Sequence, residues 1–319
     1  MSSQPPPFTD RSPVPPPVVT LKTYLRLTPR RGRRFSTSST PTRPRKRWLG
    51  CLGVILVGVM LFLLLSVYLV APGRTNILVT GIDYTDPGNA VARTDSIMLT
   101  TFVPLKPYIG ILSVPRDLWV VIPGAGENRI NTAHFYAESI QPGAGPQALL
   151  QTIQLNFGLK LDYYIRIRFE GFREVVDAMG GVYIYFDEPR AGYMAGWQHL
   201  TGRKALAFVR NRTDSDDFFR MSDGQLMVKS LFMNMLNPLK WPRLPAVVRS
   251  FFDAVDTNLP SWMWPRLGLL LLYKGPAGID YHIIDRHMVN PFTTDQGAQV
   301  LRPNWNVINP LVQGIFGNQ

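Results

Sequence analysis

The stretch SIMLTTFV, residues 96–103, is the clearest of several short apolar segments that indicate the fold class. Its β-branched and apolar residues over eight positions are typical of a buried strand. Further buried strands are expected at 77–80, 109–114 and 181–186, and residues 162–169 alternate as in a half-exposed strand. Helical patterns are expected at roughly 131–140, 146–157, 171–179, 201–210 and 223–236. Strands that alternate with helices predict an α/β sandwich with helices on both faces of the sheet.

The positive charge of the chain is concentrated at its N-terminus. The 319 residues carry a net charge of +12, of which residues 1–47 contribute +10. This segment also holds ten prolines and thirteen serines or threonines, and it lacks hydrophobic periodicity, so we expect a disordered basic tail. The remaining 272 residues carry a net charge of only +2. The high isoelectric point therefore does not indicate a nucleic-acid partner, and we expect none.

Residues 48–71, WLGCLGVILVGVMLFLLLSVYLVA, contain no charged side chain and are numerous enough to span a bilayer. Four basic residues at 43–47 precede this segment, whereas Arg74 alone follows it closely, which predicts a cytoplasmic N-terminus. A cleaved signal peptide is disfavoured because the segment is long and no A-x-A site follows. The sequence therefore predicts a signal anchor in a bacterial cell membrane and an extracytoplasmic domain at 72–319. Cys51, the only cysteine, lies within the anchor, which excludes disulfides and cysteine chemistry from the domain.

The link between the predicted anchor and the first predicted strand is short. Residues 72–76 reach at most about 18 Å when fully extended. The domain is therefore expected to lie at the membrane surface, which favours a substrate that is itself embedded in membrane lipid.

Charged residues gather at the ends of neighbouring predicted strands. Asp83 follows 77–80, Arg93 and Asp95 precede 96–103, and Arg116 and Asp117 follow 109–114. Each could be an ordinary turn residue. In open α/β sheets, however, sites form beyond the carboxyl ends of the strands. Carboxylates beside arginines favour a divalent cation and an anion held together, because Mg²⁺ takes carboxylate and phosphate oxygens and arginine forks match phosphate.

The stretch VRNRTDSDDFFR, residues 209–220, adds three further arginines, Arg210, Arg212 and Arg220. They could simply pair with the nearby aspartates and with the end of the preceding helix. If all converge with Arg93 and Arg116, the local acids are too few, and a pyrophosphate would supply the missing negative charge. We expect the helix to end at about Val209, because residues 210–212 must be extended for Arg210 and Arg212 to share a face.

Other catalytic patterns are absent from the sequence. It contains no G-x-S-x-G, no H-E-x-x-H and no P-loop. Its four histidines, at 134, 199, 282 and 287, are scattered, and we expect each to be structural or exposed. Phosphoryl transfer needs charge neutralisation and positioning more than covalent catalysis. Asp83 or Asp95 is then the nearest base for an acceptor hydroxyl.

From residue 48 onward the sequence resembles the LytR-CpsA-Psr family of cell-envelope proteins. The resemblance rests on NILVTGID (76–83), ARTDSIML (92–99), IGILSVPRDLWVVIPGAGENRINTAH (109–134), LDYYIRIRFEGFREVVDAMGGVYI (161–184), LTGRKALAFVRNR (200–212) and DFFRMSDGQ (217–225). It implies an α/β/α sandwich around a central mixed β-sheet. It also implies a transferase that moves an anionic glycopolymer from a polyprenyl-pyrophosphate carrier to a peptidoglycan hydroxyl, forming a phosphodiester.

The resemblance also implies roles for single residues. Asp83 and Asp95 would bind Mg²⁺ and, with Arg93 and Arg116, form the catalytic centre. The substrate-binding residues would be Arg210, Arg212, Arg220 and Gln225, the arginines holding the pyrophosphate and Gln225 lying near it. The polyprenyl tail would enter an apolar tunnel between sheet and helices.

Two neighbouring positions depart from the family pattern. The last motif often carries Arg and then Gln where this chain has Asp223 and Gly224. We expect Asp223 to face solvent; the alternative is altered substrate handling.

Three functions remain open. The first is the phosphotransferase, and the second is a hydrolase that uses water as acceptor on the same lipid pyrophosphate. The third is a non-catalytic, membrane-tethered lipid or wall binder. Polymer transfer measured against free phosphate release separates the first two.

Overall fold

The computed structural model describes residues 47–70, 73–82, 94–211 and 217–317. Residues 1–46 of the predicted tail lie outside the described residues, as do Asp83, Arg93 and Arg212. Helix α1 (Arg47–Val70) covers most of the predicted anchor and crosses the division between two compact units of the chain, Met1–Ile55 and Leu56–Gln319. Within the described ranges, no helix combines the length and apolarity that a membrane crossing requires. The anchor therefore stays a prediction.

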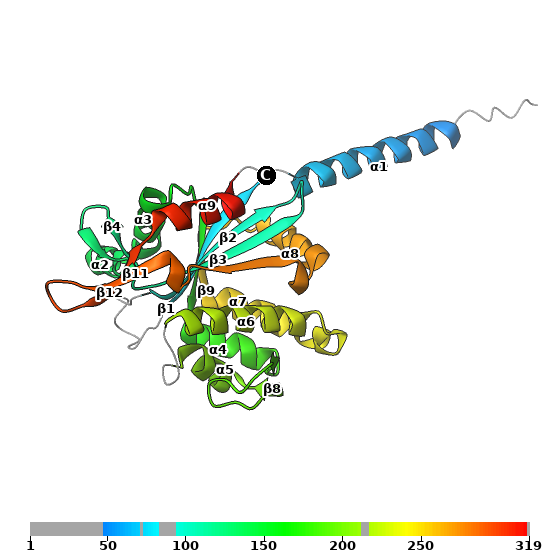
Figure 1. Ribbon diagram of the computed structural model, residues 1–319. Coiled ribbons are helices and arrows are strands. Elements are labelled where there is room, and N and C mark those ends of the chain that lie inside the picture. The colour runs from blue at the N-terminus through cyan, green and yellow to red at the C-terminus, as the bar shows by residue number, and fades with distance from the viewer. Residues whose placement is uncertain (1–46, 71–72, 83–93, 212–216, 318–319) are drawn as a thin grey trace, which may run out of the picture. The chain divides into compact units, whose positions relative to one another are not determined.

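The second unit is built around a six-stranded mixed sheet (Figure 1). The strand order is β10-β3-β2-β1-β6-β9. Neighbours β1/β2, β2/β3 and β6/β9 are antiparallel, whereas β1/β6 and β3/β10 are parallel. The central strands are β1 (Thr75–Ile82), β2 (Thr94–Val103), β3 (Tyr108–Val114) and β6 (Tyr163–Arg168), and β9 (Val255–Thr257) and β10 (Ile279–Ile283) form the edges. The central mixed sheet that the sequence implied is confirmed.

Within the described residues, three two-stranded sheets lie outside the central one. They pair β4 (Trp119–Ile122) with β5 (Gly126–Arg129), β7 (Val182–Phe186) with β8 (Gly196–Leu200), and β11 (Val289–Thr293) with β12 (Gln299–Pro303). The helices of the second unit, beyond α1, are α2 (Thr132–Ile140), α3 (Gly145–Phe157), α4 (Phe169–Ala178), α5 (Gly202–Arg210), α6 (Asp217–Met235), α7 (Leu244–Ala254), α8 (Met263–Lys274) and α9 (Trp305–Phe316). Short 3₁₀ turns are η1 (Pro238–Arg243), η2 (Pro276–Gly278) and η3 (Arg286–Met288).

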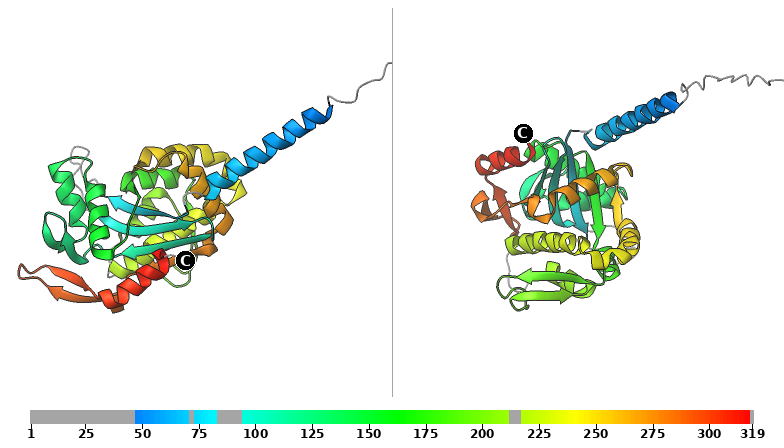
Figure 2. Two further views of the ribbon diagram at one scale, coloured as in Figure 1. Left: turned by 90° about the horizontal axis from the view of Figure 1, so that it is seen from above. Right: turned by 90° about the vertical axis from the view of Figure 1, so that its right-hand side faces the viewer.

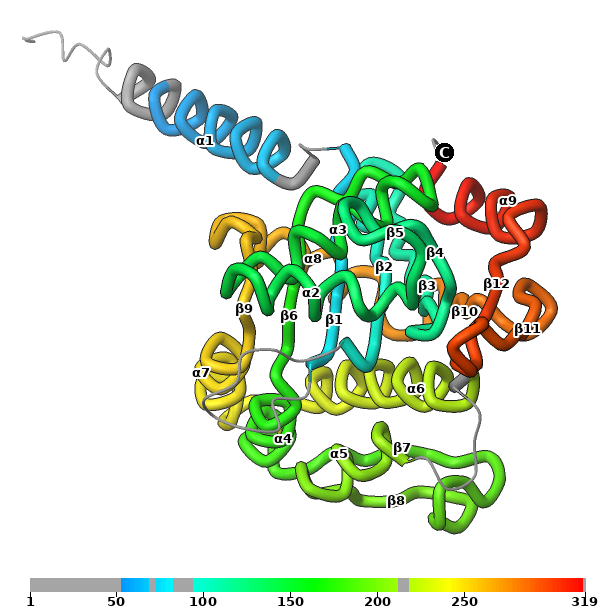
Figure 3. Tube along the Cα trace, turned by 90° about the vertical axis from the view of Figure 1, so that its left-hand side faces the viewer, coloured from blue at the N-terminus to red at the C-terminus, as the bar shows by residue number. Residues whose placement is uncertain are grey.

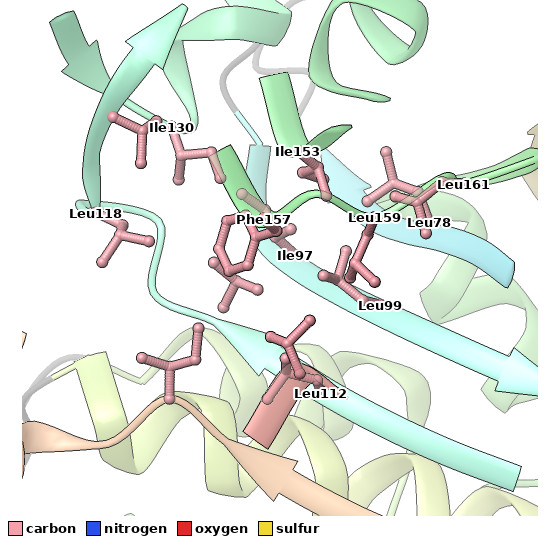
Figure 4. Close-up of a cluster of buried hydrophobic side chains, with 14 of the residues drawn as sticks. Leu78, Ile97, Leu99, Leu112, Leu118, Ile130, Ile153, Phe157, Leu159 and Leu161 are labelled. Carbon is pink, nitrogen blue, oxygen red and sulfur yellow. The ribbon is translucent and has the colours of Figure 1, made fainter. Parts of the chain in front are cut away.

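Helices cover both faces of the central sheet (Figure 2). Successive strand residues point to opposite faces, so Leu78 packs into one core and its neighbour Ile77 into another. The first core joins the sheet to α3 and α9, and Figure 4 shows Ile153 and Phe157 of α3 among the strand leucines. The opposite face packs against α8 and, through Phe232, against α6.

The segment predicted as a buried strand at 181–186 behaves differently. It becomes β7, which pairs with β8 outside the central sheet and alternates between buried and exposed residues. Its buried residues pack against α4, α5 and α6, with the rings of Phe186 and Phe208 5.2 Å apart. The segment forms a strand as expected, but the expectation that the strand is buried was wrong, because one face of this hairpin is left uncovered.

A close helix crossing fixes α4 against α7. Gly171 lies opposite Ala254, and a Cβ added to Gly171 would come within 2.7 Å of the Ala254 Cα. Backbone atoms of a packed helix do not yield at that distance, so only glycine fits without shifting α7.

We expect Gly171→Ala to lower the free energy of unfolding by about 1–3 kcal/mol, the usual cost of overpacking. Gly268→Ala is the control, because it also adds a methyl group within a helix, α8, but has nothing within 4 Å of the added Cβ. That change should be neutral or stabilise by up to about 1 kcal/mol. Urea unfolding of both full-length variants measures this, and equal effects at the two sites would contradict the packing argument.

Candidate functional site

A cavity of about 140 Å³ lies between the central sheet and helices α4 and α6. Its walls are mainly apolar and come from strand residues such as Val79, Met98 and Ile167 and from Phe172 and Met227 of the helices. The remaining lining side chains include the charged residues Asp95, Arg116 and Arg220.

The strand directions explain why these charged residues meet. Strand β2 runs antiparallel to both β1 and β3, so its first residues lie beside the carboxyl ends of its neighbours. Ser96 is opposite Gly81, and Ile97 is opposite Val114. The sequence predicted that Asp95 and Arg116 lie together at one edge of the sheet, and the structure confirms this position. Helix α6 brings Arg220 to the same cavity.

An alternating chain of charges fixes this edge. Arg116 Nη1 is 2.9 Å from Asp95 Oδ1, and Arg116 Nε is 3.5 Å from Asp117 Oδ2. The other oxygen of Asp117 lies 3.1 Å from Arg129 Nε. All four side chains are part-exposed, so solvent screens the pairs and they contribute more to position than to stability. We call these four residues, Asp95, Arg116, Asp117 and Arg129, the charge chain.

The backbone around Arg116 is held from three sides. Residues 115–118 form a turn in which the Leu118 amide donates to the Pro115 carbonyl at 3.2 Å. The Arg116 carbonyl accepts from the Asn131 amide at 3.3 Å, and the Asp117 carbonyl accepts from the Leu301 amide at 3.1 Å. Elements far along the sequence therefore fix the direction of the Arg116 and Asp117 side chains. The sequence indicated Asp117 at this strand end but gave it no role. Arg129 was not found from the sequence, because a single basic residue at the end of β5 forms no recognisable pattern.

Arg210 lies at the last position of α5, so the helix ends one residue later than expected. Asn211 follows in an extended conformation, with φ −57° and ψ 131°. The Arg210 guanidinium lies 5.5 Å from the centre of the Phe169 ring, which lines the cavity. Arg210 is exposed there. Its predicted shared face with Arg212 stays a prediction.

Gln225 is buried beside the cavity. Its Nε2 donates to Ser113 Oγ at 3.0 Å and to the His282 carbonyl at 2.7 Å. Ser113 lines the cavity, as does Gly224, the residue before Gln225. The amide therefore ties α6 to β3 and β10, and its predicted contact with substrate stays a prediction.

Asp223 does not face solvent, so that expectation was wrong. Its side chain is buried, and Oδ1 lies 2.5 Å from Nε of Arg190 in the segment between β7 and β8. Burial raises the pKa of the Asp223 carboxyl, and Arg190 offsets only part of that rise. Both residues line a second cavity, of about 230 Å³, with Glu188, Asn211 and Phe219. Sequence reasoning missed Arg190 because no local pattern connects it with residue 223.

The histidines fit the expectation of structural or exposed roles. His199 and His287 are exposed, and His282 pairs with Asp280 at 2.9 Å. His134 is fully buried and lies 3.2 Å from Nη1 of Arg166. Among the described residues, no group of three or more His, Cys, Asp or Glu side chains is arranged to hold a metal ion.

The LytR_cpsA_psr family model matches residues 67–301, so the chain belongs to this family. "Regulatory protein MsrR" of Staphylococcus aureus (strain COL) is 30% identical over 59% of this chain and 58% of its own length. "Polyisoprenyl-teichoic acid--peptidoglycan teichoic acid transferase TagU" of Oceanobacillus iheyensis is 36% identical over 50% of each chain. This chain thus matches only part of each of these two relatives.

Solved structures share the fold. TagV of B. subtilis superposes with a TM-score of 0.61 at 22% identity, over 77% of this chain and 98% of that one. The structure named "TagT bound to LI-WTA" gives a TM-score of 0.60 at 20% identity, over 77% and 92%.

A substitution at Gln225 tests whether its side-chain amide stabilises the fold or binds the ligand. Gln225→Ala should lower the free energy of unfolding by about 1–3 kcal/mol, because it leaves the buried Ser113 hydroxyl and the part-buried His282 carbonyl without their donor. Chemical unfolding measures this, with Lys229→Ala, exposed one turn along α6, as the control. Unchanged stability together with a lost affinity for inorganic pyrophosphate would show instead that Gln225 serves the ligand.

Proposed function

We propose that this protein transfers an anionic glycopolymer from a polyprenyl-pyrophosphate carrier to a hydroxyl group of peptidoglycan, forming a phosphodiester. The observation that carries the proposal is one cavity with mainly apolar walls that also presents Asp95, Arg116 and Arg220. A ligand that suits such a cavity has an apolar tail and an anionic head. The name of the relative TagU, a polyisoprenyl-teichoic acid–peptidoglycan teichoic acid transferase, supports the same reaction class.

The charged residues suit a pyrophosphate more than a single carboxylate. Arg116 and Arg220 reach the cavity from different elements, the turn after β3 and the first turns of α6. Guanidinium groups on two sides can bind oxygens of two phosphates through paired hydrogen bonds. Asp117, which is itself paired with Arg129, holds the Arg116 side chain in place. Less side-chain entropy is therefore lost when the anion binds.

The proposed reaction is a substitution at phosphorus. The acceptor hydroxyl oxygen forms a bond to the phosphorus that carries the glycopolymer, and the bond from that phosphorus to the bridging oxygen breaks. Polyprenyl phosphate leaves with the bridging oxygen, and Asp83 or Asp95 takes the hydroxyl proton. The arginines stabilise the charge that develops on the leaving phosphate.

The described residues are compatible with a magnesium ion. Mg²⁺ typically uses one or two protein carboxylates and completes its shell with phosphate oxygens and water. Asp95 supplies one carboxylate to the cavity wall, and Asp83 is the second proposed ligand. Bound there, the ion would neutralise part of the pyrophosphate charge.

We also propose that residues 48–71 anchor the protein in the bacterial cell membrane, with the N-terminus cytoplasmic and residues 72–319 outside. The basic residues before the segment and the near-neutral domain after it support this orientation. A membrane-bound protein would meet a lipid-linked donor in the plane of the same membrane.

Purified full-length protein in lipid vesicles, given lipid-linked polymer and peptidoglycan, tests the proposal. The wild-type protein should attach polymer to the wall fragment and release polyprenyl phosphate. Asp95→Ala should lower that rate by about a hundredfold or more, because it removes a charge that positions Arg116 and binds the metal. Its unfolding midpoint should change little, because Asp95 lines a cavity and is not part of the apolar core.

Asp295→Ala, which removes an exposed acid between β11 and β12, is the matched control and should transfer at the wild-type rate. Free phosphate-terminated polymer without wall attachment would indicate a hydrolase. If the wild-type protein binds the donor tightly but does not cleave it even with added Mg²⁺, the protein is a binding protein and the proposal is contradicted.

A further inference from the structure

The hairpin of β7 and β8 exposes one face made only of aromatic rings. Its inward residues, Val182, Ile184 and Phe186, belong to the core shared with α4, α5 and α6. Its four outward positions in the paired register are Tyr183 opposite His199 and Tyr185 opposite Trp197. We call these four residues the aromatic platform.

The rings of the aromatic platform are solvent-exposed and held in place. Trp197 is 68% exposed, and Tyr183 and Tyr185 are 49% and 47% exposed. Ring centres lie 4.6 Å apart in the Tyr183–His199 pair and 5.4 Å apart in the Tyr185–Trp197 pair. His199 Nε2 is fixed 3.0 Å from the Gly180 carbonyl. Fixed rings can bind a partner with little loss of side-chain entropy.

Packing within the fold does not require this face to be aromatic. The inward face of the hairpin already supplies its contacts with the helices, and strand propensity alone favours β-branched residues as much as rings. Four exposed aromatic rings side by side also lower the solubility of a protein. Exposed apolar patches of this kind on soluble proteins mark interaction sites.

The chemistry of the face fits a carbohydrate. A pyranose ring has one face of C–H groups and an edge of hydroxyl groups, so it stacks on an aromatic ring and hydrogen-bonds at its rim. The tyrosine hydroxyls and the tryptophan N–H supply polar edges to otherwise apolar rings. No outward position of the two strands carries an aliphatic side chain of the kind that a membrane-inserting face uses.

A cation lies beside the platform. Lys240 of η1 is 5.4 Å from the centre of the Tyr183 ring and donates a hydrogen bond to the Gly181 carbonyl at 2.5 Å. Peptidoglycan strands carry carboxylates on their peptide side chains, so a positive charge at one end of the platform favours this glycan over a neutral one.

The platform is also well placed relative to the cavity. The hairpin packs on α6, whose Met227 contributes both to the hairpin core and to the cavity wall. The hairpin lies at the end of the domain opposite to the start of β1, with α6 between it and the sheet (Figure 3). A membrane anchor that precedes Thr75 would leave the platform at the side of the cell wall.

We infer that the aromatic platform binds the glycan strand of peptidoglycan and presents it to the cavity as acceptor. The identity of the glycan rests on the proposed function. The stacking itself rests only on the exposed rings.

Calorimetric titration of the full-length protein with an N-acetylglucosamine hexasaccharide, and separately with unmodified peptidoglycan glycan strands, tests the inference. Trp197→Ala should weaken binding of both probes by about tenfold, and Trp197→Phe should restore most of it, because the phenyl ring keeps a stacking face. Tyr273→Ala is the control, since it removes a ring that is 75% exposed on α8, away from the platform. Tyr185→Ala is the second platform variant, and unfolding midpoints show that each variant is folded.

Equal affinities for the wild-type and Trp197→Ala proteins would overturn the inference, as would a wild-type protein that binds neither probe. Loss of binding to vesicles of anionic phospholipid in Trp197→Ala, with saccharide affinity unchanged, would show a membrane-facing surface and would also overturn it. The titration contains no lipid-linked donor. A protein that binds both probes but never transfers polymer would therefore refute the proposed function and leave the platform standing.

Discussion

The ion pair between Arg116 and Asp95 joins the two strands whose ends form the site. Asp95 stands at the start of β2 and Arg116 just after the end of β3, and the antiparallel pairing of these strands brings them within 2.9 Å. Asp117 and Arg129 extend the pair into the charge chain, while Asn131 and Leu301 hold the backbone of the turn. An arginine that is fixed in this way binds an anion without first losing side-chain freedom. Such preorganised positive charge is a main requirement of a phosphate site.

Helix α6 contributes residues to both of the cavities described above. One side of its first turns carries Arg220 and Gly224 to the apolar cavity, and the other carries Phe219 and Asp223 to the cavity beside the hairpin. The ion pair of Asp223 with Arg190 ties the hairpin to this helix. Asp223 therefore brings the Arg190 guanidinium from the segment between β7 and β8 to the first turns of α6.

Local patterns in the sequence predicted what depends on local structure. Residues 96–103 and 109–114 became strands because short apolar, β-branched runs favour burial in a sheet, and charged residues at their ends indicated the site edge. The contacts of Asp223 and Gln225 were not predictable in this way. They depend on Arg190, Ser113 and His282, which are distant in sequence and are brought close only by the hairpin and by the order of β3 and β10. The three-residue strand β9 is too short to give a pattern.

We propose that the cavity beside α6 holds the lipid tail of a donor whose anionic head contacts Arg116. A polyprenyl-phosphate analogue with a photoreactive group in its tail tests this most directly, with the attached residues identified by mass spectrometry. We expect attachment to cavity-lining residues such as Met221, Met227 and Val228. Attachment confined to exposed apolar residues elsewhere, such as Leu239 or Leu272, would contradict it.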